Sequence, residues 1–155
     1  MTSNEQLIFD FYTAFQRREA EKMVSYYADS VKFNDPGFGN LQGNEVKNMW
    51  RMLIENGTDL KIEFEITGSK DNWVNAHWEA YYTFSKTGRS IHNKIDAAFI
   101  IENGKIVSHM DTFNLWSWSK QAMGTIGLLL GWSPFFRKKL HKTTQKMLSN
   151  YSSKR

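Results

Sequence analysis

Residues 90–112, SIHNKIDAAFIIENGKIVSHMDT, decide the fold of this chain. Apolar and polar side chains alternate on both sides of Asn103-Gly104, a dipeptide that strongly favours a hairpin with a two-residue turn. The stretches 90–101 and 105–118 are therefore predicted to form paired antiparallel strands. The same period of two recurs upstream in 60–67 and 73–84, which predicts two further strands.

The predicted hairpin brings polar side chains together. With a two-residue loop, Asp96 lies directly across from Asp111, and alternation puts His109 on the same face. On a concave and partly dry face, two neighbouring carboxylates raise the pKa of one of them, and His109 could shuttle or orient a proton. The alternative is that these residues form a polar outward face.

Helices are predicted before this sheet. A capping box at Thr2/Glu5 or Ser3/Gln6 precedes a helical apolar stripe, a second helix is expected over 19–28, and a third begins at Asn44. Gly57 is predicted to end the third helix in a left-handed cap. Between the second and third helices, 31–34 reads as a short extended piece closed by Asp35-Pro36-Gly37. This order predicts an α+β fold, in which a curved antiparallel sheet surrounds a ligand pocket.

The remaining residues, 120–155, are predicted to be a helical extension packed on a domain formed by 1–119. Its last helix should begin at Pro134, and Leu128, Leu129, Leu130 and Trp132 should pack on the domain or on a second subunit. Residues 1–111 contain all 16 acids and 12 of the 20 Lys and Arg, so the end of the chain is purely basic. Such a segment can contact an anionic membrane surface or nucleic acid, or can be a solvated face. No nucleic-acid partner is expected.

Composition excludes several classes of chemistry. The chain has no cysteine, which rules out disulfides, thiolate metal sites and cysteine nucleophiles. The His and Asp residues show no metal-ligand spacing, so neither a metal nor a cofactor is expected. The first residues do not resemble a signal peptide, and the apolar stretch 122–136 is too short to span a bilayer, so a cytoplasmic location is predicted.

The order of elements and several local motifs resemble the nuclear-transport-factor-2-like superfamily, which includes ketosteroid isomerase and SnoaL-like polyketide cyclases. The resemblance covers about residues 5–116, and one of its marks is Asp96, eight residues before Gly104. Its other motifs are Phe11-Tyr12-Thr13-Ala14-Phe15, Tyr27-Ala28-Asp29-Ser30-Val31, Asn34-Asp35-Pro36, Gly43 and Gly104-Lys105-Ile106-Val107.

The resemblance implies roles for particular residues. Tyr12 falls at the oxyanion-hole tyrosine of the isomerase, Asp35 at its general base, and Asp96 at its protonated, hydrogen-bond-donating aspartate. His109 and Asp111 depart from the isomerase pattern and lie where the cyclases tend to place acid–base residues. The expected function is cofactor-independent acid–base chemistry on an apolar, carbonyl-bearing or cyclic substrate. The alternatives are a non-catalytic module that binds a hydrophobic ligand and a dimerisation module, and a homodimer is expected.

Overall fold

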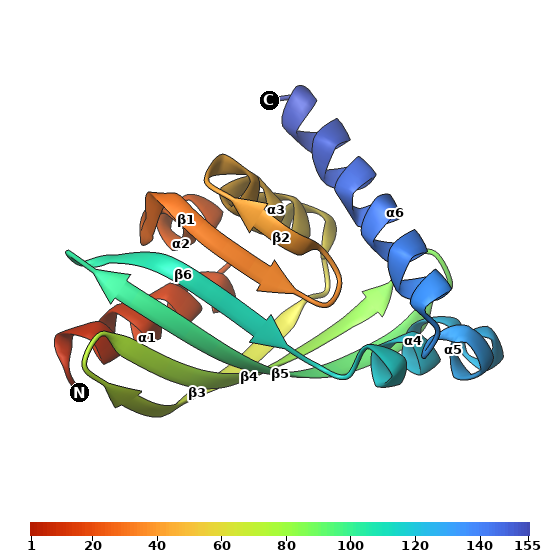
Figure 1. Cartoon of the computed structure of the whole chain (residues 1–155), viewed down its shortest axis with the longest axis horizontal. Coiled ribbons are helices and arrows are strands. Elements are labelled where there is room, and N and C mark those ends of the chain that lie inside the picture. Colours follow the sequence, from red (N-terminus) through yellow and green to blue (C-terminus); the bar gives the residue numbers. More distant parts are fainter.

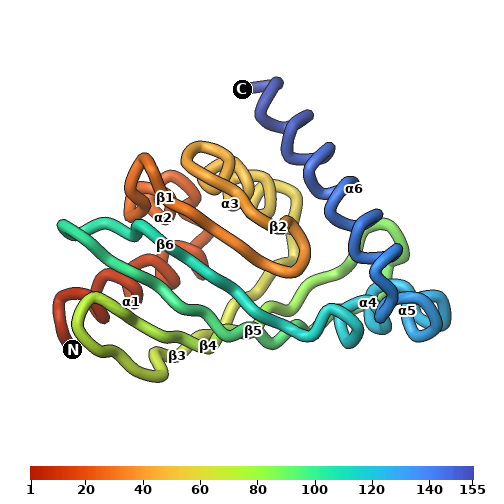
Figure 2. The backbone as a smooth tube through the Cα atoms, viewed as in Figure 1, coloured from red at the N-terminus to blue at the C-terminus, as the bar shows by residue number.

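A computed structural model covers residues 1–155 and contains one curved six-stranded sheet with helices on one face (Figures 1 and 2). The strand order is β2-β1-β6-β5-β4-β3. In chain order the elements are α1 (Ser3–Gln16), α2 (Ala20–Ser25), β1 (Tyr27–Asp35), β2 (Gly39–Gln42), α3 (Asn44–Asn56), β3 (Lys61–Lys70), β4 (Trp73–Phe84), β5 (Arg89–Glu102), β6 (Lys105–Thr112), α4 (Leu115–Met123), α5 (Thr125–Leu130) and α6 (Pro134–Ser153).

The predicted α+β class is confirmed, with some differences in detail. All neighbouring strands are antiparallel except β1 and β6, which pair in parallel. The helix expected over 19–28 stops at Ser25, because the next residues join a longer β1. Gly57 ends α3 with a φ of −83°, so it is not a left-handed cap. The last strand ends at Thr112, because the Asn114 side chain accepts a hydrogen bond from Ser117 N–H and starts α4.

The register of the β5–β6 hairpin differs from the prediction. Asn103 and Gly104 have φ values of 52° and 72°, as a two-residue turn requires, and Glu102 pairs with Lys105. A β-bulge then leaves Val107 without a partner, so that Asp111 lies opposite Ala97 and Asp96 lies opposite Thr112. The extra residue changes which face each later side chain occupies. Asp96 and Asp111 therefore project from opposite faces of the sheet, and the predicted pairing is wrong.

The hydrophobic core lies between the sheet and the helices α1 and α3. Phe11 of α1 contacts the rings of Phe99 and His109 edge-on, with centroid distances of 5.8 and 5.9 Å. Trp50 of α3 stacks on His109 at 5.9 Å, so an imidazole occupies the centre of an aromatic core. His109 is 1% exposed. Burial of a polar ring at this depth requires hydrogen-bond partners, which form part of the site described below.

The C-terminal extension has two different parts. Helix α6 is tied to the turn after β1, because Thr144 Oγ1 donates to Gly37 O and Gln145 Nε2 donates to Phe38 O, each at 3.0 Å. In contrast, α5 leaves its leucines and Trp132 exposed. These side chains do not pack on the domain as expected, and their burial by a second subunit stays a prediction. None of the helices has the length and apolarity that crossing a bilayer requires.

Helices α4 and α5 approach each other at Gly127. A Cβ atom at this position would lie 1.9 Å from the backbone carbonyl oxygen of Ser119, which has no freedom to move aside. We expect Gly127→Ala to reduce the free energy of α5 opening by about 1–3 kcal/mol, measured by hydrogen exchange of the 125–130 amides. Gly68→Ala is the control, because no atom lies within 4 Å of its added methyl group. Equal protection of α5 in both variants would contradict the prediction.

Candidate functional site

A cavity of about 310 Å³ opens between the sheet, α3, α4 and α6. Most of its wall is apolar and aromatic, with Trp50, Trp78 and Trp118 among the lining side chains. Two carboxylates, Asp35 and Asp111, and the side chains of Tyr82 and Asn93 also line it. An apolar cavity of this size with a few converging polar groups is typical of a small-molecule site.

Asp35 is held at the end of β1 by the turn that follows it. Its Oδ1 accepts a hydrogen bond of 2.5 Å from Phe38 N–H, which fixes the carboxyl group at the cavity wall. Burial raises the pKa of Asp35 to about 7, the hydrogen bond from Phe38 opposes this rise, and the negative charge of Asp111 adds to it. A carboxyl group with this pKa can both accept and return a proton near neutral pH.

Asp111 ends a buried chain of hydrogen bonds. Trp50 Nε1–H donates to the Tyr27 hydroxyl at 2.7 Å, and this hydroxyl lies 2.7 Å from His109 Nδ1. His109 Nε2 lies 2.9 Å from Asp111 Oδ1, which also accepts a longer bond of 3.4 Å from Trp78 Nε1–H. His109 Nε2 donates to the Asp111 carboxylate, which cannot itself donate, and the Tyr27 hydroxyl bonds the other ring nitrogen. The chain thus orients Asp111 through the imidazole of His109.

Two hydrogen-bond donors in the cavity were not predicted. The Tyr82 hydroxyl accepts from Trp118 Nε1–H at 2.8 Å and has no acceptor for its own proton, while the Asn93 side chain makes no hydrogen bond within the protein. Burial raises the pKa of Tyr82, so the phenol stays protonated and able to donate. A sequence signal existed for Asn93, since it occupies an inward position between Ile91 and Ile95 where the pattern of β5 is otherwise apolar.

Tyr12 lies in the core and does not line the cavity. Its ring stacks on Phe64 at 5.1 Å, and its hydroxyl is buried without any hydrogen-bond partner. Burial raises the pKa of Tyr12 well above its ordinary value, and the charge of Asp111 adds to this rise. The role implied by resemblance for Tyr12 as a donor to the substrate therefore has no direct geometric support in the cavity.

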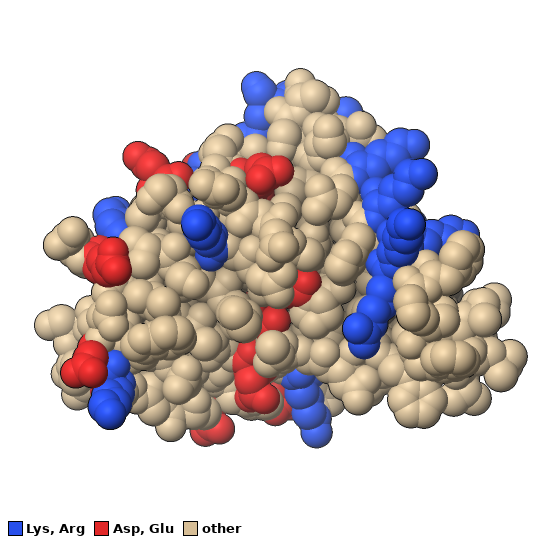
Figure 3. Space-filling view, in the orientation of Figure 1, with Lys and Arg blue, Asp and Glu red and all other residues tan.

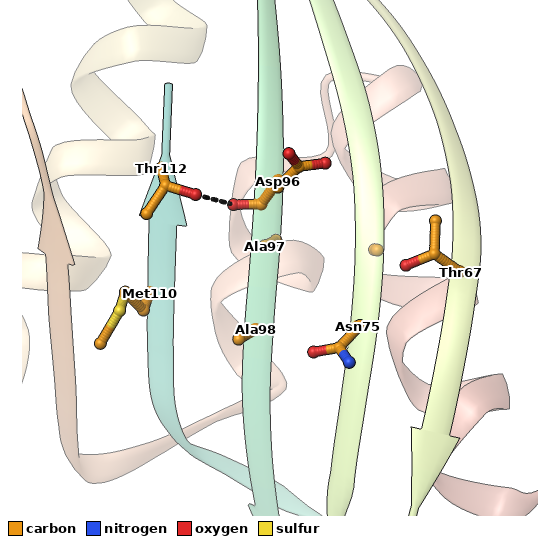
Figure 4. A pocket seen from close by; sticks show the side chains of 8 residues that line it. Thr67, Asn75, Asp96, Ala97, Ala98, Met110 and Thr112 are labelled. Carbon is orange, nitrogen blue, oxygen red and sulfur yellow. Dashed lines mark hydrogen bonds between the residues drawn. The ribbon is translucent and has the colours of Figure 1, made fainter. Parts of the chain in front are cut away.

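Asp96 lies on the outer face of the sheet, away from the cavity. Figure 4 shows it on β5 beside Thr112 of β6, on the wall of a second hollow of about 250 Å³. Its side chain is 79% exposed and lies 2.9 Å from His77 Nδ1, while His77 Nε2 lies 2.8 Å from Glu79. The structure thus brings Asp35, His109 and Asp111 together and separates Asp96 from them, because the bulge at Val107 reverses the expected facing.

The outer position of Asp96 leads to a testable contrast. The hydrogen bond to Asp96 raises the pKa of His77, and the bond to Glu79 adds to it. We expect Asp96→Asn to lower the pKa of His77 and to leave turnover unchanged. The pKa is measured by NMR titration of the His77 ring protons. Thr112→Val is the control, since it removes only a 3.3 Å bond to the Asp96 backbone carbonyl. Loss of turnover in the Asp96→Asn variant would show that Asp96 contributes to the reaction and would contradict this prediction.

No three His, Asp or Glu side chains are arranged to hold a metal ion, in the cavity or elsewhere in the chain. Besides Lys86 and several hydroxyl and amide side chains, the polar groups of the cavity include a carboxylate pair, a histidine behind one of them, and the uncharged donors Tyr82 and Asn93. Such a set can transfer protons and stabilise a developing negative charge on oxygen.

Comparison with known families agrees with this geometry. A family model described as "SnoaL-like domain" matches residues 8–109, more than half of the chain. The chain belongs to this family. No curated protein matches the sequence at a significant level. The match to the SnoaL-like domain includes Asp35 and His109 and stops just before Asp111. The walls that α4 and α6 contribute to the cavity therefore lie outside the matched part.

Solved structures show the same NTF2-like fold. An NTF2-like protein of unknown function from Burkholderia pseudomallei K96243 is 23% identical over 79% of this SnoaL-like chain and 99% of its own, with a TM-score of 0.69. An LEH-like epoxide hydrolase from M. tuberculosis is 15% identical over 83% of this chain and 96% of its own, with a TM-score of 0.64. A provisionally named polyketide cyclase from Xanthomonas campestris pv. campestris is 18% identical over 77% of this chain and 96% of its own, with a TM-score of 0.65.

Proposed function

We propose that this SnoaL-like protein is a cofactor-independent acid–base enzyme, isomerase-like or cyclase-like, that acts on a small apolar molecule with a carbonyl group. The observation that carries the proposal is Asp35, whose pKa of about 7 suits a proton acceptor at neutral pH, in an aromatic cavity that also contains Asp111. The cavity volume of about 310 Å³ suits a small cyclic substrate. The enzyme names among the structural neighbours are consistent with this class.

Asp35 is the proposed general base. Its carboxylate removes a proton from the carbon next to the substrate carbonyl. The electron pair of the broken C–H bond forms a C=C bond, and the π pair of the carbonyl moves to its oxygen to give an enolate. Protonated Asp35 then returns the proton to the same or another carbon, so the reaction needs no other reactant. In a cyclase-like reaction the enolate carbon would attack a second carbonyl carbon of the same substrate. The π pair of that carbonyl would move to its oxygen, which would take the proton from Asp35.

Tyr82 and Asn93 are the proposed donors to the enolate oxygen. Both lie in the cavity wall, and both have protons that no group of the protein accepts. Since the pKa of Tyr82 is raised by burial, the phenol donates a hydrogen bond without losing its proton. These two residues replace Tyr12 and Asp96 in the role that the resemblance implied.

Asp111 is proposed to act on Asp35 through its charge. The His109 chain keeps Asp111 in one orientation, and its negative charge adds to the rise in the pKa of Asp35. His109 is thus a positioning residue, because it contacts Asp111 and does not line the cavity.

The proposal is tested by hydrogen–deuterium exchange into apolar cyclic ketones. Candidate ketones are first selected by their ability to raise the melting temperature, and are then incubated with the protein in D2O while deuterium uptake next to the carbonyl is followed by NMR. We expect uptake to be catalysed in at least one bound ketone and to require Asp35. Ketones that bind tightly but never exchange would favour the alternative of a non-catalytic module for hydrophobic ligands.

A further inference from the structure

An exposed apolar cluster lies at the end of the molecule formed by α5 and the start of α6. We call it the apolar tip, and its side chains are between 47% and 74% exposed. They make up half of the twelve large apolar side chains that the protein exposes. The members of the tip are Ile126, Leu128, Leu129, Leu130, Trp132 and Phe135. A contiguous apolar surface of this kind marks an interaction site more often than scattered exposed residues do.

A row of basic side chains continues from the tip along α6. Phe135, Lys139, Lys142 and Lys146 are exposed and spaced by three or four residues, which puts them on one face of the helix. Figure 3 shows Lys and Arg side chains following α6 beside the uncharged bulge of α4 and α5. The exposed Lys138 borders this row, and we call Lys138, Lys139, Lys142 and Lys146 the basic stripe. No carboxylate neutralises it, since residues 112–155 contain no acid and no ion pair involves the stripe.

We propose that the apolar tip and the basic stripe together form a docking site for the surface of an anionic lipid bilayer. Leucine, phenylalanine and tryptophan side chains insert at the boundary between headgroups and acyl chains, where tryptophan is favoured. The stripe lies against negatively charged headgroups, which attract each nearby lysine. The protein lies on the bilayer and does not cross it, in agreement with the lack of a helix that could span.

Charge argues against a second copy of the chain as the occupant of this site. In a two-fold dimer that buried both the tip and the stripe, the patch would contact itself and the two basic stripes would face each other. Since neither copy has an acid in 112–155, nothing would offset the repulsion. Nucleic acid would neutralise the stripe but offers no apolar partner for the tip. The site is independent of the proposed reaction, because neither the tip nor the stripe includes Asp35 or Asp111.

The test is co-sedimentation of the full chain with vesicles of phosphatidylcholine alone or mixed with phosphatidylserine. We expect binding to the mixed vesicles that weakens with added salt, and little binding to phosphatidylcholine alone. The variant Lys138→Gln/Lys139→Gln/Lys142→Gln should lose about fivefold in affinity for each lysine, or about 100-fold in total. The variant Leu129→Ser/Trp132→Ser should lose binding to both kinds of vesicle.

The controls match these changes elsewhere on the surface. Lys32→Gln/Lys61→Gln/Lys94→Gln removes three exposed lysines from the strands, and Trp73→Ser removes a tryptophan that is 48% exposed at the start of β4. Both controls should bind vesicles like the wild type. Equal losses in the controls, or no binding by the wild type to mixed vesicles, would overturn the proposal.

Two further results would reassign the patch. A dimer seen by analytical ultracentrifugation that disappears in the Leu129→Ser/Trp132→Ser variant, without any vesicle binding, would assign the tip to a second copy. Binding of a DNA duplex that needs the stripe but not the tip, again without vesicle binding, would assign the stripe to nucleic acid.

Discussion

Asp35→Asn is expected to lower kcat/KM for exchange next to the carbonyl by about a thousandfold, because an amide cannot accept the proton that a carboxylate removes. The fold should be kept, since the Asn oxygen can accept the same hydrogen bond from Phe38 N–H. In the wild type, kcat/KM should rise as the pH increases through about 7, where Asp35 loses its proton, and then level off. The exchange assay measures both quantities.

Stability gives a second readout for Asp35 that needs no substrate. A carboxyl with a pKa of about 7 in the folded protein binds a proton that the unfolded chain releases near pH 4. Between these values the folded state binds more protons, so the wild type loses stability as the pH rises through this window. Asp35→Asn lacks this group, so its stability relative to the wild type should increase from pH 5 to pH 8 in urea denaturation.

The matched control for both readouts is Asp71→Asn, which changes an exposed turn residue with a φ of 54° that Asn tolerates. It should leave activity and the pH dependence of stability unaltered. Wild-type exchange rates in the Asp35→Asn variant would remove Asp35 as the base.

Two buried tyrosines should respond in opposite ways to loss of their hydroxyl groups. Tyr27→Phe removes the hydroxyl group that accepts from Trp50 and bonds His109 Nδ1. Trp50 Nε1–H and His109 Nδ1 would remain buried without a hydrogen bond, so the free energy of unfolding should fall by about 2–4 kcal/mol. Tyr12→Phe removes a buried hydroxyl that has no partner, and should leave stability unchanged or raise it by up to about 1 kcal/mol.

Urea denaturation of the two variants decides this contrast. Because both rings are nearly fully buried, at 0% exposed for Tyr12 and 2% for Tyr27, loss of volume affects them alike. The Tyr27→Phe variant should also lose exchange activity, since the His109 ring that orients Asp111 loses its second hydrogen bond. Equal stability losses in the two variants would mean that the chain through His109 contributes nothing beyond packing.

Much of the fold could be predicted from periodicity and turn chemistry. The alternation in 73–84 and the Asn103-Gly104 turn predicted β4 and the hairpin, and the cap at Thr2 predicted the start of α1, where the Thr2 hydroxyl accepts from Glu5 N–H. Short elements were missed. Helix α5 contains Gly127 within only six residues, so its sequence has no helical stripe, and its position depends on packing against α4.

The site could be predicted only in part, because the side of the sheet on which each residue lies depends on how distant strands pair. Asp35, His109 and Asp111 were identified as candidates, and the structure places them at or behind one cavity. Asp96 was predicted to lie on the same face because the pairing of β5 with β6 was taken to continue regularly from the turn. The residues next to Val107 give no sequence signal for a bulge. The position of the bulge depends on how β6 pairs with both β5 and β1.

The bulge at Val107 also determines how β6 tolerates changes in length. Deleting Val107 would leave Ser108, His109 and Asp111 opposite their present partners in β5, and the strand would alternate regularly from the turn onward. His109 and Asp111 would keep their inward positions, and Met110, which is 50% exposed, would stay on the outer face. A deletion beyond the bulge, such as that of Met110, would instead reverse the facing of the residues that follow, and Asp111 would leave the cavity. Alignments of distant relatives must therefore place a gap in β6 correctly before their acids are compared.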